Sequence, residues 1–324
     1  MTAQHARAFW TVAPGRGEIR EEPLAPPDLG DVVVRTLYSG ISRGTECLVF
    51  QGRVPASEYQ RMRAPFQSGD FPGPVKYGYA SVGCVDDGPE DLRERHVFVL
   101  YPHQTRYVVP ATAVHVLPND VPANRAVLAA NLETAVNALW DGAPQVGDRI
   151  TVIGAGTVGC LIAWLASRVP GCDVELVDIN PGRAQIARAL GVRFAAPDAA
   201  SSSADLVIHA SGSAAGLELA LRVAGFEATI VEMSWYGDQL VRVGLGGAFH
   251  AQRLTLKSSQ VGTVPPMRRA RWDARRRMQL ALKLLQHAEL DALITGETDF
   301  ESLPHVMADL SSGRVDAVCH CVRY

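Results

Sequence analysis

The stretch from Arg149 to Asp178 constrains the fold of this chain more than any other part of it. It begins with the uncharged, β-branched run Ile150–Ile153, which is typical of a buried strand. The motif Gly154-Ala-Gly-Thr-Val-Gly159 follows and leads into an apolar segment that predicts a buried helix. A second strand-like run then ends at Asp178. This order of strand, glycine turn, helix, strand and acid predicts a βαβ unit.

The chemistry of a dinucleotide explains this order. Gly154 permits the tight turn, Gly156 lets the backbone approach a pyrophosphate, and Gly159 lets the helix pack close to the strand. The N–H groups and the dipole at the helix start attract phosphates, and the carboxylate of Asp178 can hold ribose hydroxyls. An ordinary glycine-rich turn, or a membrane span over 150–167, would not explain the regular glycine spacing and the strand that follows. The residues predicted to contact a dinucleotide here are Gly154, Gly156, Thr157, Val158, Gly159, Asp178, Ile179 and Arg183.

Composition excludes several classes of protein. With 324 residues, 47% of them hydrophobic and 20% charged, the chain has room for two globular domains. Its formal net charge of −3 provides no general attraction to nucleic acid or to an anionic membrane, so we expect neither as a partner. Six cysteines without a CxxC pair favour a reducing compartment over a disulfide framework. Residues 1–12 lack a signal-peptide core, so we expect a cytoplasmic protein.

The pattern of strands and helices changes once along the chain. Residues 6–110 contain short strands separated by glycine and proline turns, which indicates a compact, barrel-like β domain. From Pro122 onward strands alternate with helices, which indicates a parallel sheet with right-handed crossovers. The boundary is predicted at 121, and a last helix and strand follow Pro265-Pro266.

Four motifs occur in an order that resembles the medium-chain dehydrogenase/reductases, the alcohol dehydrogenase superfamily. They are Gly40-Ile-Ser42, the glycines of 78–83, Leu132-Glu133 and the glycine motif of 154–159. The resemblance implies an α/β fold in which a Rossmann doubly wound parallel sheet joins a β-rich, GroES-like barrel. It implies a GroES-like catalytic domain over 1–121, a Rossmann domain over 122–264 and a C-terminal return to the catalytic domain over 265–324. It also implies a small-molecule substrate, and we expect a homodimer or homotetramer.

The chain departs from the zinc-binding members of that family. They have a cysteine where this chain has Ser42, and a His-Glu pair where it has Tyr79 and Ala80. Of the residues that can lie near the metal in those members, this chain keeps only the acid, Glu133. Residues 97–109 contain no cysteine, so the ligands of a structural zinc lobe are also missing. This set lacks the nitrogen and sulfur ligands that bind zinc well, so we predict a zinc-independent member with no metal site. Locally the motifs are similar to the branch that contains bacteriochlorophyllide hydroxyethyl dehydrogenase, which does not fix the substrate.

Without zinc, protein donors must manage the oxygen of a reacting alcohol or carbonyl. Tyr79 replaces a metal ligand and is the first candidate for proton donor, although it could merely fill the vacated space. Ser42 is expected in the same pocket, where it could hydrogen-bond a substrate oxygen. Lys76 could lower the pKa of Tyr79 if it lies near, or it could be solvated.

Two acids and a histidine complete the candidate catalytic set. Glu46 and Glu133 could be a buried acid and an orienting acid, or either could simply pair with an arginine such as Arg43. His103 could relay protons or could be structural.

The remaining cofactor contacts follow from family position and from strand ends. Thr134 is placed beside the nicotinamide by the resemblance. Sheets of this type bind ligands at the ends of their strands, where Ser211, Gly212, Ser234 and Trp235 are found. Asp178 favours NAD over NADP, because a carboxylate repels a 2′-phosphate at close range. NADP stays possible because Arg183 is close in sequence, although we expect that arginine to be an ordinary surface charge.

These observations predict a zinc-independent NAD(P)(H)-dependent oxidoreductase that interconverts an alcohol and a carbonyl compound. The alternatives are a quinone or enone double-bond reductase and a non-catalytic NAD(H)-binding protein. The apolar residues within 47–70 indicate a sizeable substrate, unless they belong to the core. Six arginines within 268–277 are expected to form a solvated or interdomain helix.

Overall fold

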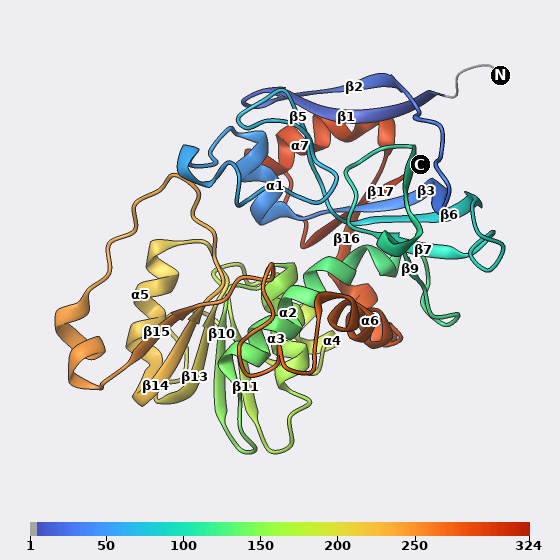
Figure 1. The fold of residues 1–324 in the computed structure, drawn as a ribbon. Helices are drawn as coiled ribbons and strands as arrows, with labels where there is room; N and C mark the ends of the chain where they lie inside the picture. Colours follow the sequence, from blue (N-terminus) through green and yellow to red (C-terminus); the bar gives the residue numbers. More distant parts are fainter. Residues whose placement is uncertain (1–4) are drawn as a thin grey trace. The chain divides into compact units, whose positions relative to one another are not determined.

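The strand predicted before the glycine motif lies in the middle of a parallel sheet. The computed structural model describes residues 5–324, and this strand is β10 (Arg149–Ile153) of a six-stranded sheet ordered β12-β11-β10-β13-β14-β15 (Figure 1). The other strands are β11 (Asp173–Val177), β12 (Arg193–Ala195), β13 (Ala204–His209), β14 (Ala224–Glu232) and β15 (Thr255–Ser258). In chain order this is 3-2-1-4-5-6, the doubly wound Rossmann arrangement, so that prediction is confirmed.

Apolar side chains explain why the sheet and its helices pack. The helix α3 (Thr157–Ala166) is apolar on all sides, and Trp164 within it is fully buried. This helix follows β10 directly, so the uncharged run over 150–167 is a strand, a turn and a helix rather than one long helix. Within the described residues 5–324, no helix is long and apolar enough to span a membrane.

Other helices that connect strands of this sheet are α4 (Arg183–Ala189), α5 (Ala214–Val223) and the short π-helix η4 (Leu245–Phe249). The helix α2 (Ala129–Gly142) precedes β10, and α6 (Ala274–Leu284) follows β15. Ser213 caps the N-terminus of α5, where its side chain accepts a hydrogen bond from the Gly216 N–H group.

Two sheets form the β-rich part of the chain. One is four-stranded with the order β2-β1-β5-β4, and the other is seven-stranded with the order β16-β17-β3-β6-β7-β9, with β8 paired to β3. The strands are β1 (His5–Ala13), β2 (Arg16–Pro23), β3 (Asp31–Ile41), β4 (Ser68–Gly69), β5 (Val75–Lys76), β6 (Ser81–Asp87), β7 (His96–Val99), β8 (Arg106–Pro110), β9 (His115–Val116), β16 (Ile294–Asp299) and β17 (Cys319–Arg323). The β-rich GroES-like architecture is therefore confirmed.

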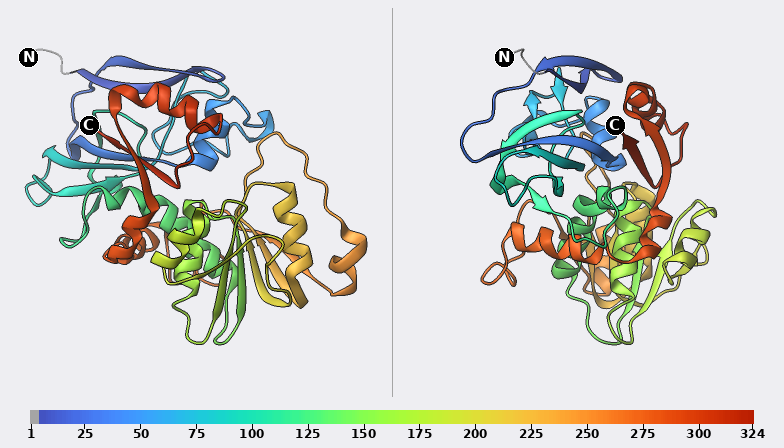
Figure 2. Two further views of the ribbon diagram at one scale, coloured as in Figure 1. Left: turned by 180° about the vertical axis from the view of Figure 1, so that it is seen from behind. Right: turned by 90° about the vertical axis from the view of Figure 1, so that its right-hand side faces the viewer.

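The remaining helical elements lie between these strands, or next to them, in the sequence. They are α1 (Arg43–Phe50), α7 (Leu303–Ser311) and the short 3₁₀ turns η1 (Ala56–Glu58), η2 (Ala111–Ala113), η3 (Arg125–Leu128), η5 (Ala288–Leu293) and η6 (Phe300–Ser302). Figure 2 shows the C-terminal segment returning to the N-terminal strands in both views. There Leu303, Met307 and Leu310 of α7 share a hydrophobic core with Phe9 and Phe50.

Contacts divide the chain into two compact units. The first comprises 1–130, 282–288 and 294–324, and the second comprises 131–281 and 289–293. The sequence placed the boundaries earlier, after 121 and 264. Met1 to Gln4, on which the export expectation partly rests, lie outside the described residues.

Candidate functional site

The glycine motif forms the turn that the sequence predicted. Gly154 has a φ of +104°, and a Cβ there would lie 2.7 Å from the backbone of Ser211. A Cβ on Gly159 would lie 1.8 Å from the carbonyl oxygen of Gly154, so only glycine lets α3 approach the turn this closely. Gly156 is exposed and faces open space. The loop therefore presents an uncovered backbone at the start of α3, as a pyrophosphate site requires.

Asp178 ties together two loops at the end of β11. Its carboxylate accepts hydrogen bonds from the N–H groups of Ala155 at 2.6 Å and of Asn180 at 2.8 Å. A carboxylate offers about four lone-pair positions, so it can still accept a ribose hydroxyl. Ile179 beside it is 87% exposed. The expectation for Arg183 is wrong: this arginine begins α4 but is buried, so it is not an ordinary surface charge.

The loops after β13 and β14 are linked at the same edge of the sheet. The Gly212 N–H group donates to the Ser234 hydroxyl at 3.0 Å, and the Ser234 N–H group donates to Glu232 at 2.7 Å. Trp235 and Thr134 are both partly buried. Whether these residues contact a cofactor stays a prediction.

In the β-rich unit, Tyr79 lies against the start of α1. Its hydroxyl forms side-chain hydrogen bonds with Ser42 and Thr45. Burial, together with the negative charge of Glu46, raises the pKa of Tyr79 to about 12, although the two hydrogen bonds act in the opposite direction. At physiological pH Tyr79 is therefore mainly a neutral phenol, which is the form that donates a proton.

Glu46 lies in a buried hydrogen-bond network behind this tyrosine. One carboxylate oxygen accepts from the Ser42 N–H group at 2.7 Å, and the other lies 2.8 Å from His103 Nε2. His103 Nδ1 lies 2.7 Å from the hydroxyl of Ser39, which is itself 3.0 Å from the Tyr324 hydroxyl. The side chains of His103 and Glu46 are 1% and 2% exposed. Glu46 is thus the predicted buried acid, and its partner is a histidine rather than an arginine.

Gly78 makes room for this histidine. It has a φ of +137°, and a Cβ there would lie 3.0 Å from His103 Cδ2. Because Gly78 has no side chain, the imidazole of His103 can occupy the space beside it.

Two neighbouring cations have other partners. Lys76 is buried, and its ammonium group binds Glu22 and Gln104, each at 2.7 Å. Lys76 is absent from the interactions that shift the pKa of Tyr79, so both expectations for it are wrong. Arg43 forms an ion pair with Asp316 at 2.9 Å, and the partner of Glu46 is His103.

Glu133 belongs to the second unit and forms a buried ion pair. Its carboxylate accepts from Arg277 Nε at 3.0 Å, and the same guanidinium binds Asn137 and the Val261 carbonyl oxygen. Burial raises the pKa of Glu133, and Arg277 partly offsets that rise. The alternative in which Glu133 pairs with an arginine is therefore the one observed. The predicted catalytic role of Glu133 stays a prediction.

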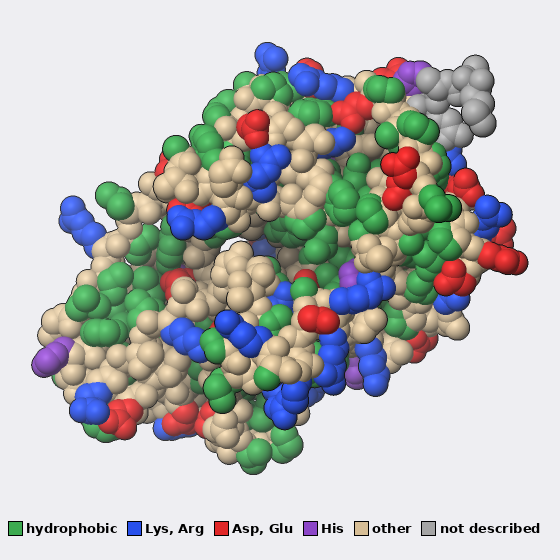
Figure 3. All heavy atoms as spheres, in the orientation of Figure 1, with side chains coloured by type: hydrophobic (Ala, Val, Ile, Leu, Met, Phe, Trp, Pro, Cys, Tyr) green, Lys and Arg blue, Asp and Glu red, His purple; other side chains and the backbone are tan. Residues whose placement is uncertain are grey.

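In the arginine-rich segment before and within α6, one arginine is buried and the others are exposed or partly exposed to solvent. Arg277 is 2% exposed, while Arg268 lies over the Trp140 ring and Arg276 over the Trp272 ring, at 5.3 Å and 4.0 Å. Basic side chains gather around α6 on the face drawn in Figure 3. A periodic surface pattern did not distinguish Arg277 from its neighbours.

The side chains at the positions expected to bind zinc in the zinc-binding members are not suited to a zinc ion. Ser42, Tyr79 and Ala80 offer hydroxyl groups and a methyl group, and His103 Nε2 already faces Glu46. Over residues 5–324, no group of three or more His, Cys, Asp or Glu side chains could hold a metal ion.

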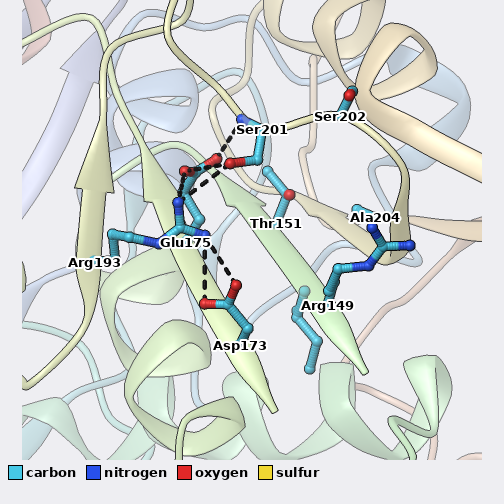
Figure 4. A pocket seen from close by; sticks show the side chains of 9 residues that line it. Arg149, Thr151, Asp173, Glu175, Arg193, Ser201, Ser202 and Ala204 are labelled. Carbon is cyan, nitrogen blue, oxygen red and sulfur yellow. Dashed lines mark hydrogen bonds and ion pairs between the residues drawn. The ribbon is translucent and has the colours of Figure 1, made fainter. Parts of the chain in front are cut away.

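A cavity of about 270 Å³ lies at the opposite, amino edge of the parallel sheet. Figure 4 shows its acids turned toward Arg193, which binds Glu175 at 2.7 Å and Asp173 at 3.2 Å. Ligands of doubly wound sheets bind at the carboxyl edge, and no predicted site residue lines this cavity. A cofactor site at the glycine motif stays a prediction, and this cavity lies away from it.

Sequence reasoning missed several members of these clusters. Only the tertiary fold brings Ser39 to His103 and Tyr324, and Thr45 to Tyr79. His209 and Glu232 meet across neighbouring strands. Alternation in β3 places Ser39 and Ile41 on one face, which could have indicated a polar group pointing inward.

Known proteins share this fold. No family model matches the chain. An L-threonine 3-dehydrogenase from Chelativorans sp. strain BNC1 is 31% identical over 125 residues, which are 39% of this chain and 36% of that protein. The chain thus matches little more than a third of that curated relative.

Two solved structures align over nearly the full length of both chains. Acetophenone reductase from Geotrichum candidum NBRC 4597 in complex with NAD has a TM-score of 0.79 and 15% identity, and covers 100% of this chain and 98% of its own. A protein from Sinorhizobium meliloti 1021 described as a zinc-binding dehydrogenase, bound to NADP, has a TM-score of 0.78 and 16% identity, and covers 99% and 100%. Over nearly its full length, the chain therefore has the fold of these dehydrogenases.

Proposed function

We propose that this protein is a zinc-independent, NAD(H)-linked oxidoreductase that interconverts an alcohol and a carbonyl compound. The observation that carries the proposal is Tyr79, a neutral phenol held by Ser42 and Thr45 at the position of a metal ligand in zinc-binding relatives. The glycine turn at the start of α3 supports the nicotinamide cofactor. The similar dehydrogenases of known fold support the reaction class.

The side chains divide the chemistry between them. The cofactor, when bound, supplies or accepts a hydride at the reacting carbon. Tyr79 donates its hydroxyl hydrogen to the substrate oxygen and gives up that proton as a carbonyl is reduced. Ser42 and Thr45 then hydrogen-bond the phenolate, while Glu46 keeps the resting phenol protonated. His103 fixes the orientation of Glu46 from behind.

Residues at the carboxyl edge of the parallel sheet would hold the cofactor. The backbone at Gly154, Gly156 and Gly159 would receive the pyrophosphate, with Asp178 on the adenosine ribose. The proposed contacts for the rest of the cofactor are Thr134, Ser211, Gly212, Ser234 and Trp235. Similar structures contain NAD in one case and NADP in another, so the preference for NAD rests on Asp178 alone.

We further propose a cytoplasmic homodimer or homotetramer whose partner is a small molecule rather than nucleic acid or a membrane. Aromatic rings extend from Tyr79 through Tyr77 and Phe71 to Tyr59, with centroids 5.7 to 6.0 Å apart. These neighbouring aromatic rings favour a sizeable, partly apolar substrate. The local resemblance to the bacteriochlorophyllide branch is compatible with such a molecule.

A substrate screen tests the proposal. Purified protein is mixed with NADH and a panel of ketones, aldehydes and enones, and oxidation of NADH is followed by absorbance while metal content is measured in the same preparation. We expect reduction of a carbonyl compound by protein holding less than about 0.1 zinc per chain. About one tightly held zinc per chain would contradict zinc independence. Turnover of enones alone would favour the double-bond reductase, and no turnover with tight NADH binding would favour a non-catalytic protein.

Replacing Asp178 by serine is expected to change the cofactor preference. The serine hydroxyl can still accept a loop hydrogen bond, but the charge that repels a 2′-phosphate is gone. The ratio of the Kd for NADPH to the Kd for NADH should fall by at least about tenfold, a free-energy change of about 1.4 kcal/mol. Fluorescence titration measures both constants.

The matched control is Asp173→Ser, which removes an exposed carboxylate at the opposite end of the same strand and should leave the ratio unchanged. Tighter binding of NADPH than of NADH by the unmodified protein would show that the role given to Asp178 is wrong.

A further inference from the structure

Three side chains at the carboxyl edge of the parallel sheet form a linear hydrogen-bonded array. His209 ends β13, Glu232 ends β14, and the two residues are paired across the strands. His209 Nδ1 lies 2.7 Å from Glu232, and His209 Nε2 lies 2.6 Å from the hydroxyl of Ser211. The imidazole is completely buried, whereas Ser211 is exposed. A serine, a histidine and an acid in this order and at these distances form a nucleophile, base and orienting group.

The negative charge of Glu232 determines which ring nitrogen of His209 carries the proton. Burial alone would raise the pKa of Glu232, but hydrogen bonds from His209 and Ser234 lower it below its ordinary range. The ionised carboxylate holds the proton of His209 on Nδ1, so Nε2 is left as the acceptor that faces Ser211. Tyr236 is the further titratable group at this cluster, and its hydroxyl donates to Glu232 at 3.1 Å. Its pKa is raised, chiefly by burial, so it stays neutral and adds no second negative charge.

The backbone around Ser211 also suits a nucleophile. Ser211 occupies the turn between β13 and α5, and nucleophilic serines of other α/β enzymes lie at such strand-to-helix turns. A Cβ on Gly216 would lie 2.2 Å from the Ser211 hydroxyl and 2.6 Å from His209 Nε2. Glycine at this position lets the first turn of α5 approach the array, and the positive end of that helix stabilises charge on the oxygen.

The β-rich unit contains a second array of the same residue types, which serves as an internal comparison. Ser39, His103 and Glu46 are joined by distances of 2.7 Å and 2.8 Å. Ser39 is only 1% exposed, so no reagent in solution can reach its hydroxyl. The two arrays therefore differ in access, and also in the imidazole nitrogen that faces the acid, which is Nδ1 in His209 and Nε2 in His103.

We propose that Ser211 is an activated nucleophile that, in the cofactor-free protein, accepts acyl groups from small carboxylic esters. The Ser211 oxygen bonds to the acyl carbon and its proton passes to His209 Nε2. The ester C–O bond breaks, and the departing alcohol takes that proton. Water then attacks the acyl-serine by the same proton route, which releases the carboxylic acid and restores Ser211. The activity does not use Tyr79 or a hydride, so either reaction can fail without the other, although bound cofactor would cover Ser211 at the proposed cofactor site.

A fluorophosphonate probe tests this activity directly, because it phosphonylates activated serines. The cofactor-free protein is incubated with the probe, its intact mass is measured, and the adduct is located by peptide mapping. We expect one adduct, on Ser211, with Ser39 unmodified. His209→Gln should slow labelling of Ser211 by about 10²-fold or more, and p-nitrophenyl acetate hydrolysis should fall in parallel.

The matched control is Ser202→Ala, which removes an exposed serine outside both arrays and should leave the labelling rate unchanged. An adduct absent from Ser211 in the unmodified protein would overturn the proposal, whether or not any variant folds. So would equal labelling in the native and the urea-unfolded protein, since the array exists only in the folded state.

Discussion

Replacing Tyr79 by phenylalanine is expected to lower kcat by about 10²–10⁴-fold, the usual effect of losing one positioned proton donor. The phenylalanine ring keeps the packing against Tyr77, so the loss is confined to the hydroxyl and its bonds to Ser42 and Thr45. The Kd for NADH should stay within about twofold, because the glycine turn belongs to the other compact unit. Steady-state kinetics on a substrate from the screen, with a fluorescence titration of NADH, measure both quantities.

Tyr77→Phe is the matched control. It removes the hydroxyl of the neighbouring tyrosine, whose contact is the Met62 carbonyl oxygen at 3.5 Å, and should change kcat by less than about threefold. A Tyr79→Phe enzyme within a few-fold of the parent would transfer the donor role to Ser42. Because the pKa of Tyr79 is about 12, we expect no loss of carbonyl reduction between pH 6 and 9 from its ionisation.

Arg277→Met is expected to reduce the free energy of unfolding by about 3–5 kcal/mol at pH 7, because it leaves the Glu133 carboxylate buried without its partner. The side chains of the pair are 3% and 8% exposed, so water cannot replace the guanidinium. The double variant Glu133→Gln/Arg277→Met removes both charges and should recover part of the loss. Urea unfolding of the three proteins measures these differences.

The loss caused by Arg277→Met should depend on pH. Arg277 lowers the pKa of Glu133 against the opposing effect of burial, so removing it raises the folded-state pKa further above the unfolded value. The folded variant then holds a proton that the unfolded chain releases, and its stability returns as the pH falls toward about 4.3. Arg269→Met, at an exposed arginine of the same segment, should cost less than about 0.5 kcal/mol at either pH. Equal losses in the two arginine variants would contradict the structural role of the pair.

Local chemistry was enough to predict the Rossmann sheet, because each part of it has its own signal. A β-branched run, glycines at fixed spacing and an apolar helix each specify one element, and their order specifies the unit. Gly159 illustrates this: its close contact with the Gly154 carbonyl oxygen is the packing that the motif predicts. The unit boundaries are harder to place, because the observed ones, at 130/131 and 281/282, fall inside α2 and α6, and each helix crosses its boundary without a break.

The polar partners of the site could not be predicted in the same way. Glu46 and His103 are 57 residues apart, and Glu133 and Arg277 are 144 apart, so no local pattern connects them. Arg183 and Arg277 were placed at the surface because arginine usually lies there, and the buried acceptors that hold Arg277 come from other segments. Pairing of this kind is decided by the tertiary fold, whereas spacing within a motif is decided by backbone geometry.

The position of β17 has a consequence for biosynthesis. This strand lies between β16 and β3, and it pairs His320 to Arg323 with Ile41 to Tyr38. While the chain is being made on the ribosome, that edge of β3 has no partner until β17 emerges. An unpaired edge readily joins another nascent chain, so the β-rich unit is expected to mature only after β17 has been made. Trigger-factor-type chaperones that shield such edges should therefore raise the soluble yield more than slower translation does.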